Sequence, residues 1–198
     1  MNEIVRDLGS DRTAVESRTG TSRRRLLFIL PALAFGGVAA ALIAGLGRNP
    51  RVLPSALVGR RVPKFALPPV QGRALGLSSE NLVGEVVLVN VFASWCTACL
   101  EEHPIFMRLR REGTIPIVGL NYKDAPADAA AWLDKHGDPY ARTGADRDGR
   151  VGIDWGAYGV PETYVVGRDG RIHHRQVGPL SEDIVSKTIM PLIEELRR

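Results

Sequence analysis

Cys96 and Cys99 are the only cysteines among the 198 residues, and they stand three positions apart in the segment Trp95-Cys96-Thr97-Ala98-Cys99. Such a pair could form a structural disulfide, bind a metal, attach haem or exchange disulfides. A disulfide that closes a two-residue loop constrains little of the unfolded chain, so it stabilises poorly. Haem attachment needs a histidine directly after the second cysteine, where this chain has Leu100.

A metal site and thiol–disulfide exchange are the remaining possibilities. His103 would add a third soft ligand to the two cysteines, but the chain offers no further cysteine to close a tetrahedral site. A Cys-x-x-Cys pair near a strand–helix pattern is typical of thioredoxin-like redox proteins. The spacing therefore favours redox exchange, with no bound metal and no cofactor other than the cysteine pair itself.

The elements around the cysteines predict how they are positioned. Residues 86–92 are apolar except for Asn90, as in a strand that is covered on both faces. Residues 97–111 carry helix-forming side chains with an apolar face. The cysteines thus lie where a strand ends and a helix begins, and there free N–H groups and the helix dipole favour thiolate over thiol.

The rest of the chain predicts an α/β fold with a mixed central sheet flanked by helices. An antiparallel strand pair is expected around Asp169-Gly170, because Asp-Gly between two β-rich runs is a strong hairpin signal. Pro191 should interrupt the last helix. The expected elements are an N-terminal hairpin over 65–75, strands at 115–120, 163–166 and 172–177, and helices at 126–136, 149–158 and 181–196.

The N-terminal quarter predicts export and anchoring. Residues 26–46 are uncharged and long enough to span a bilayer as a helix, and three arginines precede them. We expect a cytoplasmic tail over 1–25, a transmembrane anchor over 26–46, a tether over 47–62 and a folded domain over 63–198. The bulk of the chain would then be exported, with its N-terminus remaining inside. A cleaved signal peptide is the alternative.

Charge gives no sign of a nucleic-acid partner. Residues 1–46 hold six Lys/Arg against four Asp/Glu, and the remaining residues hold twenty against eighteen. These charges are interleaved, and no basic stripe with aromatic residues is present, so nucleic-acid binding is not expected.

Longer motifs narrow the class of redox protein. Residues 57–198 resemble the DsbE/CcmG family, which are membrane-tethered thioredoxin-like proteins of bacterial cytochrome c maturation. The resemblance rests on Trp95–Cys99 with Glu102-His103-Pro104 behind it, on residues 119–124 (GLNYKD) and on residues 158–164 (YGVPETY). It implies a thioredoxin fold with an extra N-terminal β-hairpin.

The resemblance also implies roles for individual residues. Cys96 should be the attacking thiolate, Cys99 should resolve the mixed disulfide, and Trp95 should shield the pair. Pro161 should follow a cis peptide bond, and the backbone of Val160 should bind an extended substrate segment by strand addition. Tyr122 is placed near the site because it follows the second strand of the sheet.

A proton acceptor for Cys99 must come from outside the central strand. Thioredoxin has a buried Asp where this strand has Asn90, and an amide cannot carry the proton. By resemblance, the candidates are Glu162, which is favoured because it follows Pro161, and Glu102, which could equally be a solvated charge on a helix face.

The function implied by the resemblance is the reduction of apocytochrome c, or of a thiol partner in its maturation, before haem attachment. A membrane thiol-electron transporter would supply the electrons. The resemblance also implies a single-pass protein of a bacterial inner membrane, with its C-terminal domain in the periplasm. Two alternatives remain open: a general periplasmic reductase or oxidase of the same fold, and a non-enzymatic module that holds apocytochrome c or a metal.

Overall fold

The computed structural model describes residue 31 and residues 33–42 and 57–198. The chain divides into two compact units, residues 1–50 and 51–198. In the first unit, residues 33–42 are helical and expose large apolar side chains such as Leu33 and Phe35. Among the described residues, no helix has both the length and the apolar character needed to cross a membrane. Most of the tail and anchor expected over 1–46 lies outside the described residues.

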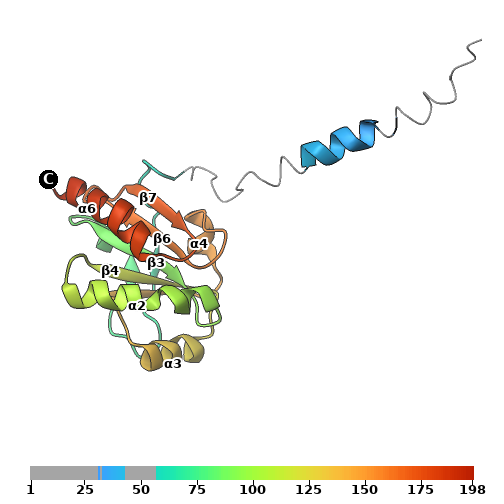
Figure 1. The fold of residues 1–198 in the computed structure, drawn as a ribbon. Coiled ribbons are helices and arrows are strands. Elements are labelled where there is room, and N and C mark those ends of the chain that lie inside the picture. The colour runs from blue at the N-terminus through green and yellow to red at the C-terminus, as the bar shows by residue number, and fades with distance from the viewer. Residues whose placement is uncertain (1–30, 32, 43–56) are drawn as a thin grey trace, which may run out of the picture. The chain divides into compact units, whose positions relative to one another are not determined.

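The second unit is organised around a five-stranded mixed sheet (Figure 1). Its strand order is β5-β4-β3-β6-β7, with β4 and β5 parallel to β3 and with β6 and β7 antiparallel to their neighbours. This confirms the expected mixed sheet and the antiparallel pair at its C-terminal end. The strands are β3 (Val87–Phe92), β4 (Ile117–Tyr122), β5 (Arg142–Asp146), β6 (Glu162–Val166) and β7 (Ile172–Val177).

β3 lies at the centre of the sheet, and all six of its residues are buried. Its side chains alternate between two apolar clusters, because successive residues of a strand point to opposite faces. Leu88 and Phe92 belong to one cluster, while Val89 and Val91 belong to the other. Asn90 therefore points to the same face as Leu88 and Phe92, and there it is a polar group in an apolar layer.

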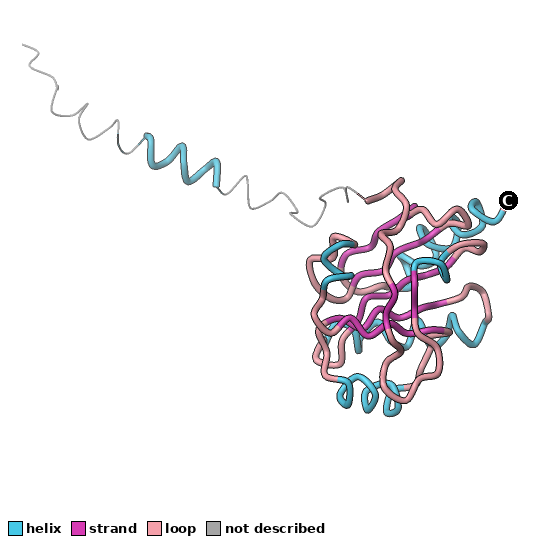
Figure 2. Tube along the Cα trace, turned by 180° about the vertical axis from the view of Figure 1, so that it is seen from behind, coloured by secondary structure: helices cyan, strands magenta, loops and turns pink. Residues whose placement is uncertain are grey.

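Helices cover the Leu88 face of the sheet. α2 (Thr97–Glu112), α3 (Pro126–His136) and the C-terminal helical segment all contribute to that apolar cluster. The other face is covered by the N-terminal hairpin β1–β2 (Ala66–Leu67 and Leu77–Ser78), the short 3-10 helix η1 (Ser79–Leu82) and α4 (Arg150–Asp154). Figure 2 shows the strands from behind, with loops joining them at both ends of the sheet.

The folded domain begins earlier than the sequence predicted. Residues 57–62 fall within the expected tether, but their backbone is hydrogen-bonded to the turn after β6 and to the first residue of β7. Gly59 N–H donates to the Ile172 carbonyl at 2.7 Å, and Val62 N–H donates to the Gly170 carbonyl at 2.9 Å. The tether expected over 47–62 is therefore corrected at its C-terminal end, because these bonds make the last six residues part of the domain.

Two other elements differ from expectation. β5 was not predicted, since Arg142–Asp146 (RTGAD) lacks an apolar alternation. The last helix is irregular, as Pro191 predicted: α5 (Glu182–Ile184) continues into a π-helical turn, η2 (Val185–Ile189), before α6 (Met190–Arg197). Proline lacks the N–H that would continue the regular helical bonding, so a wider turn directly before it accommodates the interruption.

Candidate active site

The cysteine pair lies at the first turn of α2 and is joined as a disulfide. Cys96 is the N-cap residue, and its sulfur accepts a hydrogen bond from the Cys99 backbone N–H at 3.0 Å. Both side chains are buried, Cys96 with 6% and Cys99 with 2% of its surface exposed. Cys96 is therefore the more accessible sulfur, and it faces the unpaired N–H groups that stabilise a thiolate at a helix N-terminus.

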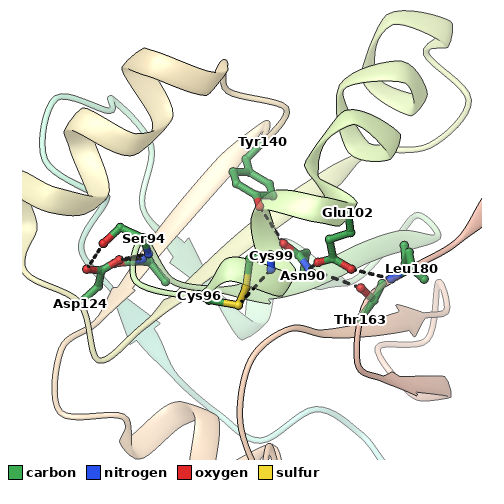
Figure 3. Close-up of a disulfide and its surroundings, with 10 residues drawn as sticks. Asn90, Ser94, Cys96, Cys99, Glu102, Asp124, Tyr140, Thr163 and Leu180 are labelled. Atoms are coloured by element: carbon green, nitrogen blue, oxygen red, sulfur yellow. Dashed lines mark hydrogen bonds between the residues drawn. A yellow bond between two sulfur atoms is a disulfide. The ribbon is translucent and has the colours of Figure 1, made fainter.

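Asp124 holds the turn that precedes the disulfide. Its two carboxylate oxygens accept hydrogen bonds from the Ser94 backbone N–H at 2.6 Å and from the Ser94 hydroxyl at 2.7 Å (Figure 3). The Asn121 amide donates to the same carboxylate at 2.9 Å. The Trp95 indole N–H donates to the Lys123 carbonyl at 3.1 Å, although the Trp95 side chain is 58% exposed. The segment 121–124 thus fixes the approach of the chain to the cysteines.

Glu102 lies one helical turn after Cys99 on the buried side of α2. Its carboxylate accepts two hydrogen bonds, from the Asn90 amide at 2.9 Å and from the Leu180 backbone N–H at 2.7 Å (Figure 3). Burial raises the pKa of the Glu102 carboxyl to about 7, and the bonds from Leu180 and Asn90 oppose part of that rise. The solvated-charge alternative for Glu102 is therefore wrong, since this side chain is 1% exposed.

Glu162 is equally buried but has different partners. Both of its oxygens pair with the Arg175 guanidinium at 2.8 Å, and they also accept bonds from the Tyr164 hydroxyl at 2.7 Å and the Tyr158 N–H at 2.9 Å. Glu162 is thus a member of a bidentate ion pair on β6 and β7. Glu102, in contrast, accepts its hydrogen bonds from uncharged groups and lies one turn after Cys99 on the same helix. The order of preference drawn from the sequence, which placed Glu162 first, is therefore reversed by position.

The peptide bond between Val160 and Pro161 is cis, as the resemblance implied. Val160 is half-buried and contacts both apolar clusters, including the one that contains Cys96 and Cys99. Pro161 is buried at the start of β6. Tyr158 is 73% exposed, and the Arg175 guanidinium stacks on its ring at 4.6 Å.

Tyr122 is not brought to the disulfide. It is the last residue of β4, and its ring packs closely against Gly149 and Gly152 in the cluster on the opposite face of the sheet. The cysteines belong to the other cluster. A position next to the end of a strand predicts the correct edge of the sheet, but it does not predict the face.

His103 has a structural environment. Its Nε2 lies 3.0 Å from the Gly137 carbonyl, and its ring packs edge-on against Trp132 at 4.5 Å. Burial lowers the pKa of this imidazole. Within the described part of the chain, no group of three or more His, Cys, Asp or Glu side chains is arranged to hold a metal ion.

Several residues of the site carry no signal in the sequence. Arg175 lies 13 positions from Glu162, and Tyr140 lies 50 positions from Asn90, whose amide oxygen it contacts at 2.7 Å. The β6–β7 hairpin places Arg175 beside Glu162, and the loop between α3 and β5 places Tyr140 beside Asn90. Asp124 could have been singled out earlier, since it ends the segment 119–124 that carries the family resemblance.

The fold and the site together define a class of protein. The chain is a thioredoxin-like thiol–disulfide oxidoreductase. It has a five-stranded mixed sheet with helices, a loop with a cis-proline, and a Cys-x-x-Cys disulfide at the start of a helix. The fold is also that of solved structures. A putative DsbE from Chlorobium tepidum has a TM-score of 0.57 at 24% identity, with 67% of this chain and 93% of that chain covered.

Sequence comparison gives the family. The redoxin family model matches residues 57–189. DsbE of Allochromatium vinosum is 42% identical over 173 residues, which cover 87% of this chain and 94% of that protein. HelX of Rhodobacter capsulatus is 42% identical over 84% of this chain and 95% of its own length, and DsbE of Escherichia coli K12 is 39% identical over 87% and 96%. The chain belongs to the DsbE family of thiol:disulfide interchange proteins.

Proposed function

We propose that the protein reduces the disulfide of apocytochrome c, or of a thiol partner that carries the electrons to it, during cytochrome c biogenesis. The observation that carries the proposal is the buried Glu102 carboxylate one turn after Cys99, in a chain of the DsbE family. A thiol that must become a thiolate inside an apolar cluster needs a nearby base with a pKa close to neutrality. Glu102 meets that requirement.

In the first step, the Cys96 thiolate of the reduced enzyme attacks one sulfur of the substrate disulfide. A new bond forms between Cys96 and that sulfur, the substrate disulfide breaks, and the other substrate sulfur leaves as a thiolate. Cys96 takes this role because it is the more exposed cysteine and caps the helix. Its thiolate is stabilised by the N–H groups of the first helical turn.

In the second step, Cys99 resolves the mixed disulfide. Glu102 accepts the Cys99 proton, and the resulting thiolate attacks Cys96. The Cys96–Cys99 bond forms, the second substrate sulfur leaves as a thiolate, and the substrate has gained two electrons from the enzyme dithiol. The Cys96–Cys99 disulfide of the structure corresponds to the product of this step.

The substrate segment would bind beside the cis-proline. The backbone of Val160 would pair with an extended substrate strand, and the rings of Trp95 and Tyr158, which are exposed, would contact that strand. Glu162 would act in this loop as a positioning group, since its carboxylate accepts the Tyr158 N–H and thereby fixes the residues that lead to Val160.

A dithiol must regenerate the enzyme, and we assign that role to a membrane thiol-electron transporter. We place the domain in the periplasm, anchored in the bacterial inner membrane through residues 26–46, with residues 1–25 in the cytoplasm. The 21-residue uncharged run and the three arginines before it support this placement. The exposed Leu33, Phe35, Val38 and Leu42 of the helical residues 33–42 are also consistent with it.

The test is the reduction potential of the Cys96–Cys99 pair, followed by the rate at which the reduced chain reduces an oxidised Cys-x-x-Cys-His peptide. We expect a potential well below that of a disulfide-forming catalyst, and faster reduction of this peptide than of a scrambled one with the same cysteine spacing. A potential of about −120 mV would overturn the assignment of the protein as a reductant. Equal rates with both peptides would instead indicate a general thiol–disulfide reductase.

A further inference from the structure

Tyr140 ends a chain of buried hydrogen bonds that leads to Glu102. The Tyr140 hydroxyl donates to the Asn90 amide oxygen at 2.7 Å, and the Asn90 amide nitrogen donates to the Glu102 carboxylate at 2.9 Å (Figure 3). The Thr163 hydroxyl is a weaker second acceptor for that nitrogen, at 3.4 Å. These groups come from α2, from β3 and β6, and from the loop between α3 and β5.

The ring of Tyr140 is held in place independently of its hydroxyl. It stacks on Phe92 at 4.8 Å between ring centroids, and its backbone N–H donates to the Asp138 carboxylate at 3.0 Å. Gly119, the β4 partner of Asn90, leaves room for it, because a Cβ at that position would lie 2.8 Å from the Tyr140 ring. These contacts therefore hold the Tyr140 hydroxyl at the Asn90 amide oxygen.

An asparagine amide has one accepting end and one donating end, so the partner of one end decides what the other offers. Here the accepting oxygen faces the Tyr140 hydroxyl, and the donating nitrogen faces Glu102. A flipped amide would present its oxygen to the carboxylate and would leave the buried Tyr140 O–H without an acceptor. An unmade bond of this kind is costly, so the flip is disfavoured.

We propose that Tyr140 is a positioning residue for Glu102: its hydroxyl fixes the Asn90 amide in the orientation that donates to the carboxylate. The proposal rests on the proposed role of Glu102 as the proton acceptor for Cys99. Through the Asn90 amide, a residue of the loop between α3 and β5 then controls how well Glu102 accepts a proton, and no contact between Tyr140 and the sulfurs is required.

The titratable groups around Glu102 are few in the described structure. The Cys99 sulfur lies one turn earlier on α2, and the Tyr140 hydroxyl approaches from the α3–β5 loop. β3, β6 and the loop before α5 present the uncharged groups of Asn90, Thr163 and Leu180. Burial is the main reason that the pKa of Tyr140 lies well above its usual value, so the hydroxyl keeps its proton and stays a donor.

The experiment follows the carboxyl carbon of Glu102 by NMR in the oxidised full chain, where neither cysteine titrates. In wild type the midpoint is expected at about 7. In Tyr140→Phe the Glu102 midpoint should rise by about one pH unit, because the Asn90 amide is no longer held with its N–H toward the carboxylate. This change is equivalent to the loss of one net hydrogen bond to the charged form. The pH profile of peptide reduction should move in the same direction.

Tyr164→Phe is the matched control. It removes a buried hydroxyl that donates at 2.7 Å to the other carboxylate, Glu162, so the Glu102 midpoint should stay where it is in wild type. An unchanged midpoint in Tyr140→Phe would overturn the proposal. If that variant does not fold, the chemical shifts of the Asn90 side-chain amide protons in wild type test the proposal. These protons should respond to the titration of Glu102. Amide protons that contact the Tyr140 ring instead would refute the proposed orientation.

The outcome separates this inference from the proposed function. If Glu102→Gln leaves the pH profile of peptide reduction unchanged, Glu102 is not the proton acceptor, and the proposed mechanism fails. The midpoint measured in Tyr140→Phe still reports whether Tyr140 orients the amide.

Discussion

Replacing Glu102 by Gln should remove a specific pH dependence of stability. The folded protein binds the Glu102 proton up to a pKa of about 7, whereas the unfolded chain releases it near 4.5. Below pH 4.5 both states carry the proton, so the carboxyl costs nothing. Between these values only the folded state keeps the proton, so the free energy of unfolding falls as the pH rises.

The size of this fall follows from the distance between the two values. Each pH unit corresponds to about 1.4 kcal/mol, so the full effect is about 3 kcal/mol and is complete just above pH 7. The side chain is almost fully buried, so little of this is screened by solvent. In Glu102→Gln, the uncharged amide cannot titrate, and the free energy of unfolding should become correspondingly flatter over this range.

Urea unfolding of the oxidised protein between pH 4.5 and 7.5, followed by tryptophan fluorescence, measures the effect. The quantity of interest is the difference between wild type and Glu102→Gln at each pH, which cancels other titrating groups. Glu101→Gln is the matched control, because the Glu101 side chain neighbours Glu102 in the sequence but is exposed. The free energy of unfolding of this variant, plotted against pH, should run parallel to that of wild type. Parallel curves for wild type and Glu102→Gln would refute a raised pKa at Glu102.

Three further predictions concern other parts of the site. Cys99→Ser should accumulate a mixed disulfide between Cys96 and an oxidised peptide, visible by mass spectrometry, whereas Cys96→Ser should form none; the reverse pattern would exchange the proposed roles. Arg175→Met should cost about 3–5 kcal/mol of stability in urea unfolding, because it leaves Glu162 charged and buried without its partner, and adding Glu162→Gln should recover most of the loss. Asp124→Ala should cost about 1–3 kcal/mol, because the backbone and hydroxyl groups before the cysteines lose their acceptor; a loss below about 0.5 kcal/mol would show that the turn holds without it.

The elements whose signals are local could be predicted from the sequence. Apolar residues from 86 to 92 predicted β3, and Pro126 with Gly137 predicted both ends of α3, because proline suits the first turn of a helix and glycine follows its last. Asp169-Gly170 predicted the hairpin between β6 and β7. In each case, the residues that form the signal also form the structure.

The elements that depend on distant partners could not be predicted. β5 contains Gly144, where a Cβ would meet Leu67 and Leu77 of the N-terminal hairpin at 3.0–3.1 Å, so this strand is shaped by what packs on it. The surroundings of Glu102 depend in the same way on the fold, because Leu180, whose backbone N–H donates to this carboxylate, lies 78 positions away along the chain.

The hydrogen bonds of residues 57–62 also fix where this segment joins the sheet relative to the disulfide. They attach the chain beside Ile172, which pairs with Val166, and Val166 in turn pairs with Val87 at the start of β3. The cysteines follow the other end of β3, and a strand of that length spans about 20 Å. Residues 57–62 and the disulfide therefore lie at opposite ends of the central strand, so this segment joins the sheet away from the sulfurs.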